Sequence, residues 1–280
     1  MSIERIIKEY EEKKENLIEY DSYINHVREY KGYVFKEIND IKKFNNEAKW
    51  LNKLMELKYD SPKMIGTYNQ VIITEKIDAD AINDNEAKEH LYNIGKLIAN
   101  LHNLSIKTNV DWKQELRLEF KELKALAENI IEEKLYKSIV DFIEKTIENI
   151  KISKTCIIHK DIRPGNVLHK EGKYYLLDFE SMSLGDRDYD FIRMFNIFNQ
   201  KEIYTYEDFK KFVDGYNSIS KIDFSIEKWK LYSKYYAFRM YTRILSGKVN
   251  RSEEFERYLM DILEDKKDRI TEWIEKYNLQ

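Results

Sequence analysis

Two stretches of this sequence decide its fold: residues 157–168, IIHKDIRPGNVL, and residues 176–180, LLDFE. Each begins with an apolar run that is typical of a buried β-strand and passes directly into a polar loop. The first loop carries Asp161 and, five positions later, Asn166, and the second begins with Asp178. The two loops therefore bring two carboxylates and one amide to the ends of two strands.

These three side chains are the types that handle a hard divalent cation and a hydroxyl group. Mg²⁺ takes a few oxygen ligands from a protein and others from phosphate, and Asn166 and Asp178 would supply the protein's share. The other carboxylate, Asp161, can then orient a hydroxyl and accept its proton. One base, two metal ligands and no other nucleophile favour phosphoryl transfer, in which the protein mainly positions groups and neutralises charge.

The motif HxDxxxxN at 159–166, followed by DFE at 178–180, resembles the catalytic and metal loops of the protein-kinase-like fold. The closest resemblance is to the aminoglycoside phosphotransferase and choline kinase superfamily of small-molecule kinases. It covers most of the chain, weakly outside the motifs. It implies an α+β, bilobal fold with a small N-lobe of antiparallel sheet plus helix and a large, mainly helical C-lobe.

The resemblance also implies an activity. It points to a Mg²⁺-dependent phosphotransferase that moves the γ-phosphate of ATP or GTP to a hydroxyl of a small molecule, such as an aminoglycoside, choline or a related amino alcohol or sugar. Asp161 would be the catalytic base, and Arg163 would contact the transferred phosphate. Asn166 and Asp178 would bind the metal. His159 is expected to brace the loop.

The order of apolar patterns along the chain predicts a small sheet-bearing lobe followed by a large helical lobe. Before residue 78 we expect helices at 3–19 and 42–57 and strands at 23–30, 33–38, 64–68 and 71–76, with a hairpin turn at Lys31-Gly32. After it we expect helices at 85–103, twice within 112–149 and over 206–278, with strands at 156–158 and 174–177. Residues 1–77 would form the nucleotide-binding lobe and 78–280 the catalytic and substrate-binding lobe.

The first lobe contains candidates for the nucleotide site. A kinase needs a strand lysine on the phosphates and a helix carboxylate that pairs with it. Lys36 lies in the apolar strand after the hairpin, and Glu47 lies on the next helix. Both have the expected order and sit on the expected elements.

Two further parts of the nucleotide site follow from the resemblance. The stretch 21–26, DSYINH, takes the place of the Gly-rich loop of protein kinases but contains no glycine, so Ser22 and Asn25 would donate to the phosphates. The stretch 74–77, TEKI, corresponds to the hinge, where backbone groups of Glu75 and Ile77 would bind the purine edge. Because side chains do not make that contact, the sequence does not distinguish adenine from guanine as the base that binds.

The catalytic segment distinguishes two branches of the kinase-like fold. The loop HKDIRP at 159–164 resembles that of protein kinases, which keeps a protein Ser/Thr kinase-like enzyme as an alternative. Against it, Glu180 replaces the Gly of their Asp-Phe-Gly motif, and no proline follows to form Ala-Pro-Glu. The run LGDRDYD at 184–190 matches the small-molecule branch, in which Asp190 would hydrogen-bond the catalytic loop. A third reading is a non-catalytic nucleotide-binding pseudokinase module.

Two features near the C-terminus concern the acceptor, and neither decides it. Residues 229–241 form an aromatic-rich helix, which packs in a core or forms a wall or cage for a sugar or quaternary ammonium. Residues 253–265 carry an acidic run, which is a solvated face or a site for a polycation. Leu101-His102 resembles the end of a family helix, with His102 as a structural hydrogen bonder.

Composition bounds the partners and the compartment. The 280 residues include 48 Lys and Arg against 51 Asp and Glu, a formal net charge of −3, which argues against a dedicated nucleic-acid or membrane-surface protein. The single Cys156 excludes an intramolecular disulfide and fits a reducing compartment. We expect no signal peptide or spanning helix. The expectation is a cytoplasmic monomer or homodimer that binds a nucleotide and a small-molecule hydroxyl substrate, not nucleic acid or membrane.

Overall fold

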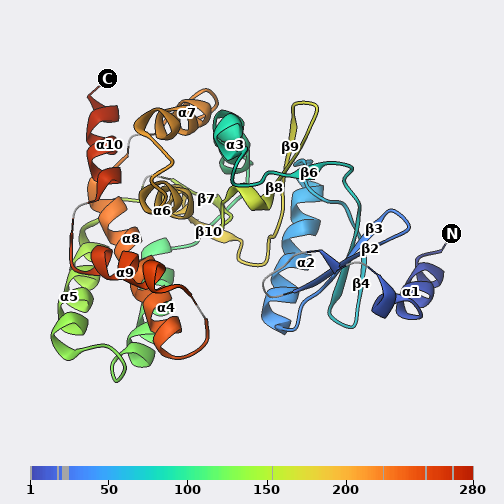
Figure 1. Ribbon diagram of the computed structural model, residues 1–280, viewed down its shortest axis with the longest axis horizontal. Helices are drawn as coiled ribbons and strands as arrows, with labels where there is room; N and C mark the ends of the chain where they lie inside the picture. Colours follow the sequence, from blue (N-terminus) through green and yellow to red (C-terminus); the bar gives the residue numbers. More distant parts are fainter. Residues whose placement is uncertain are drawn as a thin grey trace. The chain divides into compact units, whose positions relative to one another are not determined.

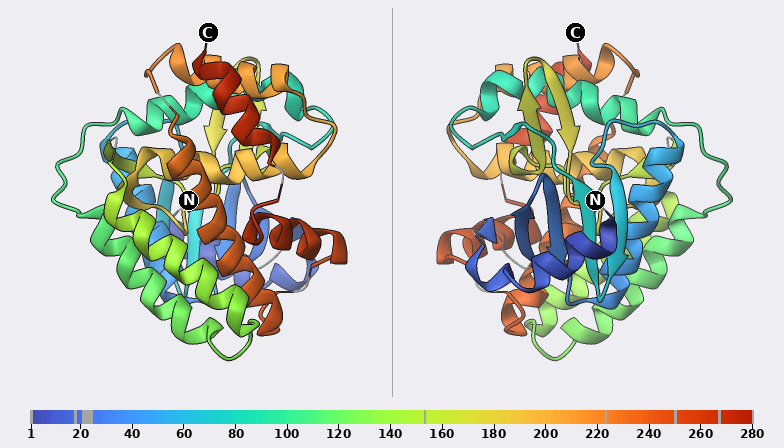
Figure 2. Two further views of the ribbon diagram at one scale, coloured as in Figure 1. Left: turned by 90° about the vertical axis from the view of Figure 1, so that its left-hand side faces the viewer. Right: turned by 90° about the vertical axis from the view of Figure 1, so that its right-hand side faces the viewer.

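The computed structural model describes residues 2–17, 19–20, 25–152, 154–222, 224–249, 251–266 and 268–279 (Figures 1 and 2). The chain forms two compact units. The first unit comprises Met1–Ala87 and Pro164–Met182, and the second comprises Lys88–Arg163 and Ser183–Gln280. A segment from the second half of the sequence therefore completes the first unit.

The first unit is built on antiparallel strands. A five-stranded sheet has the order β1-β2-β3-β5-β4, and a three-stranded sheet has the order β6-β8-β9. The elements are α1 (Ile3–Glu11), η1 (Lys14–Asn16), β1 (Glu19–Tyr20), β2 (His26–Tyr30), β3 (Tyr33–Glu37), α2 (Ile41–Glu56), β4 (Met64–Tyr68), β5 (Val71–Glu75), β6 (Asp80–Ala81), η2 (Pro164–Asn166), β8 (Val167–Lys170) and β9 (Lys173–Leu176).

The two helices of this unit cover opposite faces of the five-stranded sheet (Figure 1). Ile6 and Tyr10 of α1 pack with Phe35, Val71 and Ile73, and the rings of Tyr10 and Phe35 stack with centroids 3.8 Å apart. Side chains alternate along a strand, so the residue after Phe35 must face the other way. Lys36 therefore points to the face that α2 covers.

Hairpins with left-handed turn residues set the register of both sheets. Lys31 and Gly32 have φ of 51° and 77°, as a type I′ turn requires, and Tyr30 pairs with Tyr33 across it. This confirms the predicted hairpin. A turn at residues 171–172 with φ of 50° and 78° joins β8 to β9 in the same way.

The second unit is mainly helical. Its helix α8 packs against α4, α5, α6, α9 and α10. A two-stranded antiparallel sheet pairs β7 with β10. The elements are α3 (Ala87–His102, whose first residue belongs to the first unit), α4 (Trp112–Ala127), α5 (Glu133–Asn149), β7 (Thr155–Ile158), β10 (Ser183–Asp186), η3 (Arg187–Phe191), α6 (Ile192–Gln200), α7 (Tyr206–Asn217), α8 (Ile226–Leu245), α9 (Glu253–Leu263) and α10 (Arg269–Asn278).

Two glycines let α3 and α7 approach each other closely. A Cβ atom on Gly95 of α3 would overlap the backbone of Phe212, and a Cβ atom on Gly215 of α7 would overlap the backbone of Tyr92. Each helix thus presents a glycine to the backbone of the other. Only glycine fits at such contacts, which accounts for two of the eight glycines in this chain.

The predicted α+β class, with an antiparallel sheet and helices in one part and mainly helices in the other, is confirmed. The helix expected over 3–19 was too long, because α1 ends at Glu11 and a separate 3₁₀ turn follows. The expected strand 23–30 begins at His26, and its first two residues lie outside the described part. Within the described residues, no helix combines the length and apolarity needed to cross a bilayer.

The boundary expected after Ile77 divides the chain by sequence order, whereas contacts define the compact units. The pairing of β6 with β8 and the bond from Ile82 N to Val167 O, 3.0 Å long, tie residues 78–87 and 164–182 to the first unit. The nucleotide-binding role of 1–77 and the catalytic role of 78–280 stay predictions.

Candidate active site

A partly buried lysine joins two carboxylates in the first unit. Lys36 Nζ lies 2.7 Å from Glu47 Oε2 and 2.7 Å from Asp178 Oδ1. Lys36 comes from the middle of β3, and Glu47 lies on the buried side of α2, which Asp40 caps by accepting from two backbone N–H groups. The ion pair between Lys36 and Glu47 that the order of elements predicted is present.

The electrostatics of this cluster keep the lysine charged. Burial alone would lower the pKa of Lys36, but the carboxylates of Glu47 and Asp178 outweigh burial and raise it. Burial raises the pKa of Glu47, and Lys36 opposes that shift. The ammonium group is therefore fixed in place and remains protonated at neutral pH.

The two residues expected to bind metal flank the β8–β9 hairpin. Val167 pairs with Leu176, and Leu177 N donates to the carbonyl of Asn166 at 2.9 Å. Asn166, which is buried, precedes β8, and Asp178 follows β9. Asp178 has a φ of 68°, the left-handed region that Asp enters more readily than most residues. Pairing within one hairpin thus fixes where both backbones lie.

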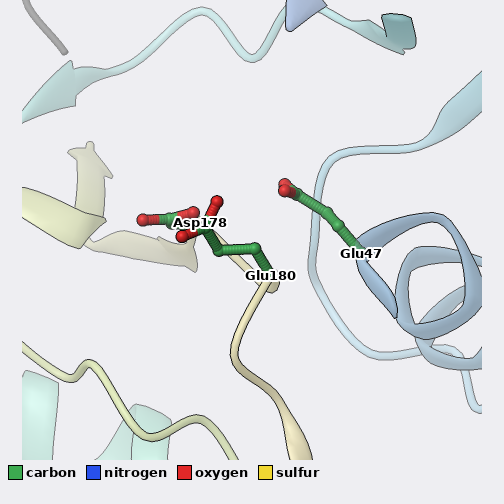
Figure 3. A group of neighbouring side chains, drawn as sticks. All are labelled: Glu47, Asp178 and Glu180. Carbon is green, nitrogen blue, oxygen red and sulfur yellow. The ribbon is translucent and has the colours of Figure 1, made fainter. Parts of the chain in front are cut away.

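A third carboxylate that the sequence reading left without a role joins this cluster. Carboxylate oxygens of Glu47, Asp178 and Glu180 all lie within 4.8 Å of one another, and Figure 3 shows the three groups turned toward a common space. Glu180 also pairs with Lys43 and accepts from Asn25 Nδ2 at 3.0 Å. The signal was its carboxylate in place of the protein-kinase glycine, but nothing local in the sequence indicated these contacts.

Other predicted nucleotide residues of the first unit have defined positions. Asn25 is buried beside Glu180. Glu75 ends β5, and its backbone N–H donates to the carbonyl of Lys63 at 2.9 Å. Ile77 is half-buried, and its carbonyl accepts from Ala79 N at 2.9 Å. Ser22 lies outside the described residues. The nucleotide contacts expected of all four stay predictions.

In the second unit, the predicted base sits between two arginines. Arg163 Nε lies 3.3 Å from Asp161 Oδ2, and Arg193 Nε lies 3.0 Å from Asp161 Oδ1. Arg193 comes from α6 and also donates to the hydroxyl of Tyr236 on α8. Sequence reasoning missed Arg193, whose contact with Asp161 has no local signature in the sequence.

A buried carboxylate holds the loop that carries this base. Asp190 accepts from the backbone N–H of His159 at 2.7 Å and of Lys160 at 2.6 Å, and it lies 3.0 Å from His102 Nε2. His102 Nδ1 lies 2.9 Å from the hydroxyl of Tyr216. These contacts confirm the scaffold roles predicted for Asp190 and His102. They also hold Lys160 at a φ of 68°, a conformation that costs a non-glycine residue energy.

Comparisons with known proteins agree with this fold and these motifs. The family model described as "Phosphotransferase enzyme family" matches residues 35–216, more than half of the chain. Sequence comparison with curated proteins gives no match. The structure is similar to the crystal structure of the choline kinase LicA from Streptococcus pneumoniae, with a TM-score of 0.69, 16% identity and coverage of 94% of this chain and 99% of that chain.

Two further solved structures are similar. The amicoumacin kinase hAmiN, in complex with AMP-PNP, Ca²⁺ and Ami, gives a TM-score of 0.66 at 14% identity over 95% of this chain and 94% of that one. The ADP-bound aminoglycoside phosphotransferase APH(2'')-Ib gives 0.62 at 16% identity over 98% and 99%. At such identities the likeness is one of fold.

Fold and motifs together define a kinase that acts on small molecules, as the sequence predicted. The chain belongs to the phosphotransferase enzyme family. The expected superfamily is therefore confirmed.

Proposed function

We propose that this chain transfers the γ-phosphate of ATP or GTP to a hydroxyl group of a small molecule, with Mg²⁺ as cofactor. The observation that carries the proposal is the contact of a single ammonium group, that of Lys36, with both Glu47 and Asp178. Kinase-type phosphoryl transfer uses such an ion pair beside a metal-binding aspartate. The nucleotide ligands named for hAmiN and APH(2'')-Ib support a nucleotide donor here.

The residues expected to bind metal fit a hard cation. Asn166 offers an amide oxygen and Asp178 a carboxylate, and one hairpin holds both backbones. Three carboxylates within 4.8 Å also concentrate negative charge, of which Lys36 and Lys43 neutralise a part. Asn166 and Asp178 would hold Mg²⁺, which would supply neutralisation of the phosphate charge.

The chain's other groups divide between donor and acceptor. Lys36, fixed by Glu47, would bind the nucleotide phosphates, with Ser22 and Asn25 contributing donors, and the backbone of Glu75 and Ile77 would bind the base. Asp161 would orient the acceptor hydroxyl and accept its proton. Arg163, which contacts Asp161, would also contact the transferred phosphate.

The test pairs two lysines of the first unit. Lys36→Met removes the partly buried ammonium, whereas Lys42→Met removes an exposed one at the start of α2. We expect ADP or GDP release with Mg²⁺ and one or more hydroxyl compounds from a panel of aminoglycosides, amino alcohols and sugars. Lys36→Met should lower kcat/KM by about 10²–10³-fold, the effect of losing one charge-stabilising donor, and Lys42→Met should not. Equal turnover in wild type and Lys36→Met would contradict the proposal.

The remaining parts of the proposal concern compartment and partners. The formal charge of −3 and the lone Cys156 support a cytoplasmic protein that binds neither nucleic acid nor membrane. We expect a monomer or homodimer. Light scattering on the purified chain measures its mass, and fractionation of cells locates it.

A further inference from the structure

Two arginine side chains contact the single carboxylate of Asp161 in the second unit. Arg163 and Arg193 already occupy one carboxylate oxygen each, at 3.3 Å and 3.0 Å. Arg193 also lies over the ring of Tyr236, with its Cζ 5.8 Å from the centroid. Through Arg193, the segment of α8 around Tyr236 is therefore linked to the loop that carries Asp161.

The same face of α8 carries two more arginines beyond Tyr236. Residues three and four positions apart lie on one face of a helix, so Tyr236, Arg239 and Arg243 form a continuous stripe. Arg239 is half-buried and Arg243 is exposed. The stripe therefore runs from the contact with Arg193 outward to solvent.

Arg239 is the unusual member of this stripe. Its Nε is enclosed and has no hydrogen-bond partner among the described residues. The phenols of Tyr189, Tyr235 and Tyr236, together with Glu119, raise the pKa of Arg239, although burial opposes them. At neutral pH the phenols are uncharged, so Glu119 is the carboxylate that acts on Arg239 in this group.

Glu119 is already shared with other groups. Its Oε1 lies 3.2 Å from Lys160 Nζ, and its Oε2 accepts from the hydroxyl of Tyr235 at 3.2 Å. Within the contacts described, three cationic side chains face two carboxylates; the cations are Lys160, Arg163 and Arg193, and the carboxylates are Asp161 and Glu119. Arg239, one helical turn beyond Tyr236, adds a further cationic group.

Positive neighbours also act on the arginines themselves, although the pKa of Arg193 and that of Arg239 are raised on balance. Burial lowers the pKa of Arg193, but Tyr236 and Asp161 outweigh burial and raise it. The charge of Arg239 opposes part of that rise. Burial, followed by the charges of Arg239 and Arg251, lowers the pKa of Arg243. A partly buried excess of positive charge is costly unless an anion compensates it. Guanidinium groups bind carboxylates and phosphates well because their donors match two oxygen atoms at once.

We infer that the acceptor molecule carries an anionic group, a carboxylate or a phosphate, in addition to the hydroxyl that is phosphorylated, and that Arg193 and Arg239 bind this group. The inference rests on the proposed function and narrows its acceptor class. A polycationic aminoglycoside or choline would add to the positive charge beside Asp161. In the acidic run at 253–265, Glu253 and Glu254 are exposed at the start of α9, and Asp265 already pairs with Lys234.

Matched acceptors test the charge of the substrate. Ethanolamine and serine differ by one carboxylate, and choline and carnitine differ by one carboxymethyl group, while glycerol, glycerate and glycerol 3-phosphate compare neutral, carboxylate and phosphate forms. Binding in the presence of a non-hydrolysable nucleotide and phosphate transfer from ATP or GTP are measured for each. We expect at least one anionic member to bind and react about tenfold or more better than its counterpart. The preferred anionic member identifies carboxylate or phosphate as the recognised group.

Variants then assign the recognition to Arg239. Arg239→Gln should lower affinity for the preferred anionic acceptor by about 10- to 100-fold, the effect of losing a charged hydrogen bond, and leave nucleotide affinity unchanged. Arg239→Lys should restore part of it. Arg117→Gln, which removes an exposed arginine of α4, is the control and should behave as wild type. Melting temperatures of all variants report on folding.

Two outcomes overturn the inference. The first is that no anionic member binds or reacts better than its counterpart. The second is that Arg239→Gln, folded as wild type, keeps the anionic preference. If choline, ethanolamine or an aminoglycoside is the better acceptor, the inference fails while the proposed kinase function stands. If nucleotide neither shifts the melting temperature nor is consumed with any acceptor, the proposed function itself fails.

Discussion

Lys36 Nζ and Asp178 Oδ1 are 2.7 Å apart, although 142 residues separate them in the sequence. The contact joins a strand of the five-stranded sheet to the loop after β9, so the phosphate-binding candidate and a metal-binding candidate share one ion pair. Any cation bound through Asp178 uses a carboxylate that already lies beside an ammonium group. Nucleotide binding and metal binding should therefore depend on each other.

The first prediction concerns this dependence on metal. Asp178→Asn removes one negative charge from the site, so the Mg²⁺ concentration for half-maximal turnover should rise about tenfold or more. EDTA should abolish turnover of the wild type. Asp60→Asn, an exposed change in the same unit, is the control. Turnover that persists in EDTA would show that no divalent cation takes part.

The second prediction tests the base. Asp161→Asn keeps the size of the side chain but cannot accept the hydroxyl proton, so kcat should fall by about 10²–10⁴-fold. Nucleotide affinity, measured by titration calorimetry, should change little because Asp161 acts on the acceptor. Full turnover in this variant would remove Asp161 from the role of base.

The third prediction concerns the support of the catalytic loop. Asp190→Asn replaces one of the oxygens that accept from His159 N, Lys160 N and His102 with an NH₂ group, which donates. Two buried donors would then face each other without an acceptor. We expect a loss of about 1–3 kcal/mol in unfolding free energy and a lower kcat, with nucleotide affinity retained. Chemical denaturation measures the first effect, and Asp141→Asn on the exposed side of α5 is the matched control. An unchanged free energy would contradict the scaffold role.

The fourth prediction concerns the crossing of α3 and α7. Alanine favours a helix over glycine by about 1 kcal/mol, but the methyl group of Gly215→Ala would overlap the backbone of Tyr92. The overlap should dominate and destabilise the protein by about 1–3 kcal/mol. Gly66→Ala in β4 meets no atom within 4 Å and serves as the control. A higher melting temperature for Gly215→Ala would show that the helices can move apart freely.

The fifth prediction concerns Cys156, which is 2% exposed in β7. Burial, assisted by the charge of Asp190, raises the pKa of its thiol well above the usual value. The reactive thiolate is therefore scarce and shielded at neutral pH. A chromogenic thiol reagent should label the folded protein very slowly and the denatured protein once per chain. The absorbance of the released chromophore measures the extent of labelling. Rapid labelling of the native chain would mean that β7 opens readily.

Local patterns were sufficient for the parts of the site that follow strands and helices. Lys36 and Glu47 could be predicted because their elements occur in a recognisable order, and Asp190 because its run closely follows Asp178, the aspartate expected to bind metal. The contacts of Glu180 and Arg193 join distant segments, which have no local signature. The short strands β6 and β10 were also missed, since each is defined by its pairing partner and not by its own few residues.

Helix ends and the unit boundary were less predictable for a related reason. The apolar pattern of α1 continues to Leu17, so the sequence indicated a longer helix, yet Leu17 packs against the core cluster from outside that helix. An apolar residue can be buried without extending the helix that precedes it. Likewise, contacts made by β8 place residues 164–182 in the first unit, which sequence order could not indicate.

The stacked pair of Tyr10 and Phe35 makes the alternation of side chains along β3 critical. Phe35 and Lys36 are consecutive and serve opposite faces of the sheet, one the hydrophobic contact with α1 and the other the ion pair with Glu47. A single inserted or deleted residue between Tyr33 and Phe35 would exchange their destinations, putting an ammonium against an aromatic ring and a phenyl ring among carboxylates. This strand can therefore vary by substitution but not in length, and an intact β3 length is a criterion for choosing active sequences from any library of variants of this chain.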